Sequence, residues 1–548
     1  MVELVYLWVE EYKNIKNQGF NFSPRFTCDF KAEYEKYTDE NGKEKERLKD
    51  KCELVINPKE FVENFFGENI NITAIVGENG SGKSSVLEFL AEIFRIEYNK
   101  NRNLIVDTEH SNKFSLAFKI KDKTYKIKSI NNHDSNTFNE DDKIENILDY
   151  YVYSSDIKIK NQLLFDNSSI AKMIVSNYSQ SENFQLSSFM YLPTKIEIRL
   201  CDFERKFVQL ITNDKLYPLS RYERDDIYIK NTSDEQQTQI ANFESLHNDK
   251  YFQFLILILI EHKEDTHDFN LTKEKVEDTL KAQNIEVISE DDFNRYFKIS
   301  EELGEMLAKE VSALEKKEKE VYIDKYSDFF EYDFIDEKNR RYSDLSHGEK
   351  TLFGQLLNIY YNSQKSKNDN LLFLFDEPEI SLHPNWQKNY INELSNLLIQ
   401  MKKNYHFIFT SHSPFLLSDL PKENVIFLKK DEKTGECVNA TNRVNLNTFG
   451  ANIHTLLSHG FFMKDGLMGE FAKGKIDKAI QYLNQKSLSK EEIDYCENII
   501  YIIGEPIIKN QLQRILDSKR LSKIDNLDRL EEELEFIKHR IEMIRKKQ

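Results

Sequence analysis

The chain has 548 residues, of which 39% are hydrophobic and 31% charged, and this balance excludes a disordered or fibrous protein. A formal net charge of −18 argues against a generic nucleic-acid coat, although an acidic protein can still carry a local basic patch. The apolar runs are much shorter than the ~20 residues of a membrane helix, and the N-terminus does not resemble a signal peptide, so we expect a cytoplasmic protein without membrane contact.

The first half of the chain is predicted to be mostly strands. We expect one helix there, over residues 84–97, directly after a glycine cluster. A polar stretch over 131–185 is predicted to be rich in loops. The predicted strands are 2–9, 26–34, 52–56, 71–76, a hairpin over 114–130, and 194–200.

The second half is predicted to be largely helical. Residues 249–317 read mostly as helix, including 250–262 and 292–317. Short apolar strands are predicted at 371–375 and 407–410, and helices again dominate after about residue 450.

The last segment has a coiled-coil pattern of its own. Its apolar residues are spaced 3, 4, 3, 4 and 3 apart, which places them at the a and d positions of a short heptad repeat. Two interpretations remain open: a terminal helix packed on its own domain, or a helix that binds a partner or a second copy. The residues are Leu527, Leu530, Leu534, Ile537, Ile541 and Ile544.

Residues 77–84, GENGSGKS, match the phosphate-binding loop (Walker A) pattern GxxxxGK[ST] between a predicted strand and helix. Glycines let backbone N–H groups curl around a phosphate without Cβ clashes. Lys83 is predicted to contact the β- and γ-phosphates, and the Ser84 hydroxyl to bind Mg²⁺. The predicted ATP-binding residues are Gly77, Glu78, Asn79, Gly80, Ser81, Gly82, Lys83, Ser84 and Ser85.

An apolar strand followed by acidic residues, LLFLFDEPE over 371–379, supplies the second half of the predicted site. Asp376 would stand at the carboxyl end of that strand and bind Mg²⁺ together with Ser84. Glu377, the next residue, is positioned to polarise the attacking water. We therefore expect Mg²⁺ and ATP as cofactors.

Residues 344–350, DLSHGEK, resemble the signature motif of ABC-type ATPases, in the LSxGE form of the SMC, RecF and OLD-like heads. The resemblance implies an α/β fold, namely an ABC-type P-loop ATPase head with a helical/β insertion and a helical C-terminal region. It also implies that two heads close over ATP, so that Ser346, Gly348 and Glu349 of one copy reach the nucleotide of the other. His347 reads as an exposed helix-start residue, with a phosphate or partner contact as the alternative.

By the same resemblance, His412 in TSHSP is the switch histidine that senses the γ-phosphate, which makes Glu377, His412 and Lys83 the predicted catalytic residues. Residues 381–384, SLHP, resemble the D-loop at the head–head interface. The glutamine loop has no clear counterpart, and residues 153–156 are a weak candidate.

Four segments follow His412: TFGANIH (448–454), LLSHGFF (456–462), GEFA (469–472) and IGEP (503–506). They resemble the C-terminal region of the PtuA ATPases of Septu anti-phage defence systems, including retron-associated forms. It lacks the acidic pattern of a Toprim nuclease domain, and His454 and His459 do not form an HNH motif. The resemblance implies a separate HNH nuclease partner, PtuB, and in some systems a retron reverse transcriptase with its nucleic acid. DNA contact through such a complex is also expected.

This interpretation divides the chain into four parts: an N-terminal lobe of the head (1–130), an insertion (131–335), a C-terminal lobe (336–435) and a helical partner-binding or oligomerisation region (436–548). The predicted function is an ATP-hydrolysing subunit whose head-to-head dimers regulate the nuclease. The alternatives are a RecF-type DNA-binding repair ATPase, an autonomous nuclease with an unrecognised site, and a nucleotide-sensing scaffold with little turnover.

Overall fold

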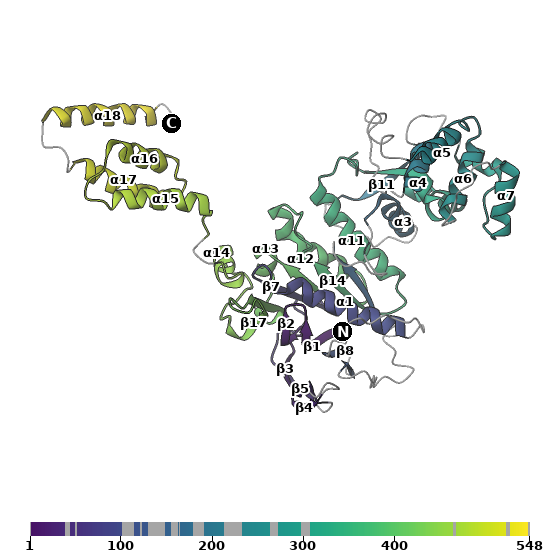
Figure 1. The fold of residues 1–548 in the computed structure, drawn as a ribbon, viewed down its shortest axis with the longest axis horizontal. Coiled ribbons are helices and arrows are strands. Elements are labelled where there is room, and N and C mark those ends of the chain that lie inside the picture. The colour runs from purple at the N-terminus through teal and green to yellow at the C-terminus, as the bar shows by residue number, and fades with distance from the viewer. Residues whose placement is uncertain are drawn as a thin grey trace. The chain divides into compact units, whose positions relative to one another are not determined.

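The computed structural model divides into two compact units, residues 1–462 and 463–548 (Figure 1). It describes residues 2–38, 44–49, 52–100, 114–120, 123–129, 148–154, 163, 165–178, 191–212, 233–262, 272–297, 307–463, 467–521 and 527–545. Within these ranges, no helix is both long and apolar enough to cross a bilayer.

A ten-stranded sheet organises the first unit, in the order β10-β14-β15-β7-β16-β17-β2-β1-β8-β9. The first five strands are parallel, and antiparallel pairs from β1, β2, β8 and β9 extend the sheet. The strands are β1 (Val2–Tyr12), β2 (Ile15–Asn21), β7 (Ile70–Gly77), β8 (Phe114–Ile120), β9 (Lys123–Ser129), β10 (Asp149–Tyr153), β14 (Asn370–Asp376), β15 (Asn404–Ser411), β16 (Val425–Lys430) and β17 (Cys437–Asn439).

The parallel strands are apolar on both sides because helices cover both faces. On β14, Leu372 and Leu374 pack with α1 (Lys83–Lys100) in one cluster, whereas Phe373 and Phe375 pack with α11 (His347–Lys365) and α12 (Pro384–Ile399) in the other. The chain therefore has the predicted α/β fold of a P-loop ATPase, and the predicted strands at 71–76, 371–375 and 407–410 are confirmed.

The first unit also contains a smaller three-stranded antiparallel sheet, in which β11 lies between β12 and β13. Its strands are β11 (Pro193–Leu200), β12 (Leu307–Glu310) and β13 (Phe330–Asp336). The helices of this part are α3 (Asn167–Tyr178), α4 (Phe203–Thr212), α5 (Asp234–Glu244), α6 (Lys250–His262), α7 (Lys273–Ala282), α8 (Glu290–Tyr296) and the single turn α10 (Lys316–Lys319). Two small hairpin-like sheets, β3 (Phe26–Lys31) with β6 (Glu53–Pro58) and β4 (Tyr34–Thr38) with β5 (Glu44–Leu48), complete the strands.

The structure contradicts one prediction for this part and tests a second only in part. The helix predicted over 292–317 ends at Tyr296, and residues 307–310 form a strand, because their backbone pairs with β11 despite the helix-favouring side chains around them. Of the segment 131–185, which was predicted to be rich in loops, the structure describes residues 148–154, 163 and 165–178. These residues supply β10, which pairs with β14, and the helix α3, and the rest of the segment lies outside the described residues.

The second unit has its own apolar core, formed by α15 (Glu470–Leu483), α16 (Lys490–Ile502) and α17 (Pro506–Leu521) and followed by α18 (Leu527–Arg545). The helical character predicted for the C-terminal segment is confirmed here. The predicted start of that region at 436 lies inside the first unit, because β17 pairs with β16 and β2. The finer four-part division of the chain stays a prediction.

Candidate nucleotide-binding site

The glycine-rich loop connects β7 to α1, as the sequence predicted. Gly77, Gly80 and Gly82 have φ values of +153°, +71° and +100°. A Cβ atom on Gly77 would lie 1.9 Å from the Leu428 carbonyl oxygen of the neighbouring strand β16. Glycine at this position is therefore required by close backbone packing as well as by the shape of the loop.

Lys83 is folded into this loop and is only 5% exposed. Its Nζ donates hydrogen bonds to the carbonyl oxygens of Glu78 at 2.9 Å and Gly77 at 3.3 Å. Burial lowers the pKa of Lys83, while the carboxylates of Glu377 and Asp376 oppose that shift. An anion bound in the loop would compensate the buried positive charge of Lys83, and a phosphate group of a nucleotide is such an anion.

Asp376 and Ser84 meet at the carboxyl end of β14. Ser84 Oγ donates to Asp376 Oδ1 at 3.0 Å, and Thr410 Oγ1 donates to the same oxygen at 2.6 Å. Mg²⁺ prefers oxygen ligands and is usually held by one or two side chains together with substrate phosphates. The carboxylate and hydroxyl at this point fit such a site.

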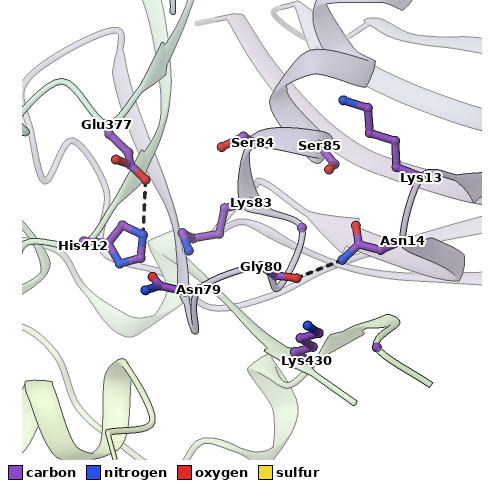
Figure 2. Close-up of a pocket in the computed structure, with 12 residues that line it drawn as sticks. Lys13, Asn14, Asn79, Gly80, Lys83, Ser84, Ser85, Glu377, His412 and Lys430 are labelled. Atoms are coloured by element: carbon purple, nitrogen blue, oxygen red, sulfur yellow. Dashed lines mark hydrogen bonds and ion pairs between the residues drawn. The ribbon is translucent and has the colours of Figure 1, made fainter. Parts of the chain in front are cut away.

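Glu377 and His412 approach each other beside the loop (Figure 2). His412 Nε2 lies 3.2 Å from Glu377 Oε1, and this contact is the main reason that the pKa of Glu377 is lowered. Glu377 has a left-handed backbone with φ of +47°, and its N–H donates to Thr410 Oγ1 at 3.0 Å. The ionised carboxylate of Glu377 is consequently held in place and is able to accept a proton from water.

A buried carboxylate that sequence analysis did not single out supports this pair. Glu379, 3% exposed, accepts hydrogen bonds from Ser411 Oγ at 2.6 Å and from the His412 backbone N–H at 2.8 Å. Burial raises the pKa of Glu379. No local pattern distinguishes Glu379 from other acidic residues that follow a strand. Only the pairing of β14 with β15 brings it to the backbone of His412.

The loop, Glu377 and His412 line a pocket of about 590 Å³. Its predicted members are Asn79, Gly80, Gly82, Lys83, Ser84, Ser85, Glu377 and His412, and its unpredicted members are Lys13, Asn14, Lys430 and Gly435. Lys13 and Asn14 come from the turn after β1, Lys430 is the last residue of β16, and Gly435 lies in the β16–β17 connection. Asn14 Nδ2 donates to the Gly80 carbonyl oxygen at 3.1 Å, so this turn supports the loop directly (Figure 2).

The signature residues Ser346, Gly348 and Glu349 lie elsewhere, at the start of α11, and do not line this pocket. Ser346 is the N-cap of the helix: its Oγ accepts the Glu349 N–H at 3.3 Å in a capping box. A Cβ on Gly348 would lie 2.7 Å from the Ser381 carbonyl oxygen, so the first turn of α11 packs closely on the predicted D-loop. His347 is the first residue of this helix, as expected.

The remaining predicted positions are placed as follows. Glu78 Oε2 accepts the Lys430 N–H at 3.3 Å, and Ser81 is buried in the loop. Tyr153, in the weak candidate for the glutamine loop, lines a separate pocket, and Asp156 lies outside the described residues.

The parallel part of the sheet carries a glycine-rich loop and a buried lysine after β7, and an acidic pair at the end of β14, with β15 between these two strands. This arrangement defines a P-loop nucleotide-binding domain. Residues 72–418 match the family described as "AAA domain, putative AbiEii toxin, Type IV TA system". The chain belongs to this family of AAA-type ATPase domains.

Shorter matches relate the chain to three curated proteins. It is 33% identical over 96 residues to "Retron Ec83 probable ATPase" of Escherichia coli and 27% identical over 121 residues to "Retron Vc95 probable ATPase" of Vibrio cholerae serotype O1 biovar El Tor. It is 34% identical over 93 residues to "Protein ea59" of Escherichia phage lambda. These matches cover 16%, 21% and 17% of this chain and 17%, 22% and 17% of the respective relatives.

Proposed function

We propose that this protein hydrolyses ATP as a subunit of an anti-phage defence complex, in which ATPase heads pair and regulate a separate HNH nuclease of the PtuB kind. The observation that carries the ATPase part is the convergence of Lys83, Ser84, Glu377 and His412 in one pocket, with Asp376 hydrogen-bonded to Ser84.

Each side chain has a distinct role in this proposal. The loop amides and Lys83 bind the β- and γ-phosphates of ATP, and Ser84 and Asp376 hold Mg²⁺. Mg²⁺ would neutralise phosphate charge when it is bound. Glu377 orients the attacking water and accepts its proton, and His412 holds Glu377 and contacts the γ-phosphate.

The decisive experiment replaces the proposed base. Glu377→Gln keeps the size of the side chain and a hydrogen-bond acceptor for His412, but it cannot accept a proton. We expect ATP to bind with near-normal affinity and turnover to fall by about 10²-fold or more. Unchanged turnover would contradict the role of Glu377, and Lys83→Ala, which should weaken binding itself, provides the comparison.

Head-to-head pairing is supported by the signature segment. The start of α11 offers the Ser346 hydroxyl and backbone N–H groups at a helix N-terminus, a favourable place for a phosphate of a second copy. ATP should therefore cause the Glu377→Gln variant to associate, which would be seen as an increase in the mass of the particle. Adding Ser346→Arg to this variant should prevent the increase. A mass that does not respond to ATP would favour a nucleotide-sensing scaffold.

The defence role is supported by the family description and by the names of two relatives, each of which is called a retron probable ATPase. To test the defence role, the chain is co-expressed with an HNH protein or a reverse transcriptase from the same locus. The complex is then purified and assayed for nuclease activity with and without ATP. The RecF-type alternative predicts instead that the chain alone binds DNA tightly and with a steep salt dependence. The net charge of −18 argues modestly against this alternative.

A further inference from the structure

The terminal helix α18 packs on its own unit through one defined face. Arg540 Nη2 donates to Gln513 Oε1 of α17 at 3.0 Å, and Arg540 Nη1 lies 3.8 Å from Glu497 Oε1 of α16. The Arg520 guanidinium lies 5.5 Å from the centre of the Phe536 ring. Phe536 and Arg540, four residues apart, therefore mark the face of α18 that contacts α16 and α17.

The apolar heptad positions lie on a different face. Leu534, Ile537 and Ile541 are 55%, 54% and 45% exposed. With 3.6 residues per turn, their mean direction is roughly 110° around the helix from that of Phe536 and Arg540. Single exposed apolar residues are ordinary, but Leu534, Ile537 and Ile541 belong to one seam. By sequence, Leu527, Leu530 and Ile544 extend this seam, and the structure describes only the backbone of these last three residues.

We propose that this seam binds α18 of a second copy of the chain in an antiparallel two-helix coiled coil. In an antiparallel pair, a positions lie opposite d positions. Leu534 then lies opposite Ile537 of the partner subunit, and Leu530 opposite Ile541 of the partner subunit. All six apolar positions are matched in this single register.

The charges beside the seam favour the antiparallel orientation. Glu531 and Lys538 are exposed and occupy e positions, which face each other in an antiparallel pair, so each Glu531 meets Lys538 of the partner subunit. The g positions Glu533 and Arg540 match in the same way by sequence, and Arg540 there also keeps its contacts with Gln513 and Glu497 of its own unit. A parallel pair would bring Arg540 against Arg545 of the partner subunit and would keep only the attraction between Glu533 and Lys538.

This contact goes beyond the proposed ATPase function because it does not involve the nucleotide site. The helix has 19 residues and a length of about 28 Å, so the pairing is expected to depend on protein concentration. Pairing through α18 would join two chains before ATP is present, and head-to-head pairing would then be a second, ATP-dependent association.

The first test measures the mass of the full-length protein without nucleotide, by sedimentation equilibrium over a concentration series. We expect a monomer–dimer equilibrium in the wild type and a monomer in Leu534→Glu/Ile541→Glu. Glu531→Lys alone and Lys538→Glu alone should each weaken the dimer, whereas the double exchange should restore it, because it recreates the opposite charges in reverse. A monomeric wild type, or single exchanges without effect, would overturn the proposal.

Crosslinking tests the orientation. When chains carrying Leu530→Cys are mixed with chains carrying Ile541→Cys, oxidation should link the two kinds of chain, and neither kind should link to itself. Self-linking of each variant would instead show a parallel pair and overturn the antiparallel register. ATP turnover, measured on the same variants, reports separately on the proposed ATPase function, so failure of one proposal does not imply failure of the other.

Discussion

Glu379 and His412 are joined through the backbone: a carboxylate oxygen of Glu379 accepts the His412 N–H at 2.8 Å. The same oxygen accepts the Ser411 hydroxyl at 2.6 Å, and the carboxyl group is buried. Glu379 therefore fixes the end of β15 against the loop after β14, and with it the position of the histidine that contacts Glu377. It is a positioning residue, since it does not line the pocket.

We predict that Glu379→Ala lowers kcat by about tenfold or more, because a small displacement of a positioning group strongly affects turnover. The KM for ATP should change little, since Lys83 and Ser84 are not touched. Glu379→Gln retains an oxygen acceptor and should keep most of the activity. Steady-state ATPase assays measure kcat and KM for both variants. An equal loss of kcat in the two would show that turnover depends on the charge of Glu379 and not on its oxygen acceptor.

The ring of His412 also stacks on Phe461, with ring centres 6.4 Å apart and an angle of 24° between the planes. Phe461 lies two residues before the second unit begins. We predict that Phe461→Leu, which retains apolar volume, lowers kcat by about two- to tenfold, the equivalent of one lost aromatic contact. Phe66→Leu is the matched control, because Phe66 is buried to a similar degree and its ring packs edge-on against Phe65. A similar loss in both variants would contradict a specific role for Phe461.

The phosphate loop could be predicted from sequence because its chemistry is local. The spacing of Gly77, Gly82 and Lys83 already fixes which backbone groups surround a phosphate, and a strand and helix on either side supply the context. Asp376 and Glu377 could be predicted for a similar reason: a short apolar run predicts a buried parallel strand, and functional residues gather at the ends of such strands.

Residues whose roles depend on pairing between distant segments could not be predicted in this way. Asn14 reaches the phosphate loop only because β2 pairs with β17 near the β16–β17 connection, and Thr410 reaches Asp376 only through the register of β14 and β15. The strand over 307–310 was mistaken for helix for the same reason, since its partner β11 is more than a hundred residues earlier. Long-range pairing outweighs local helix preference here.

Gly77 provides a steric test of the loop. Because a Cβ at this position would meet the Leu428 carbonyl oxygen at 1.9 Å, Gly77→Ala must displace either β16 or the loop. We predict a loss of stability of about 1–3 kcal/mol together with loss of ATP binding, measured by urea unfolding and by calorimetric titration. Gly469→Ala is the control, since nothing lies within 4 Å of its added Cβ, and it should change neither quantity.

His406 links the first strand to the centre of the sheet. Its Nδ1 accepts the Leu4 N–H at 2.8 Å, and its Nε2 lies 3.1 Å from Thr73 Oγ1. Because the Thr73 hydroxyl donates to the Phe22 carbonyl oxygen, it can accept from Nε2–H, so the neutral ring satisfies Leu4 and Thr73. Asn71 Nδ2 is a third polar neighbour, 3.2 Å from Nε2. Complete burial lowers the pKa of His406 to about 3, and the nearby charge of Arg25 adds to this effect.

The folded pKa of His406 lies below the ordinary value of about 6.5, so between these limits the unfolded chain binds a proton that the folded chain does not. The contribution of His406 to stability is therefore complete above about pH 6.5 and falls by about 1.4 kcal/mol for each pH unit below it. Between pH 7 and pH 5 we predict a loss of about 2 kcal/mol from this residue, measured by urea unfolding at both values. His406→Gln, which retains an acceptor for Leu4 and does not titrate, should lose about 2 kcal/mol less than the wild type over this interval. An equal loss in both proteins would mean that His406 titrates normally in the folded state.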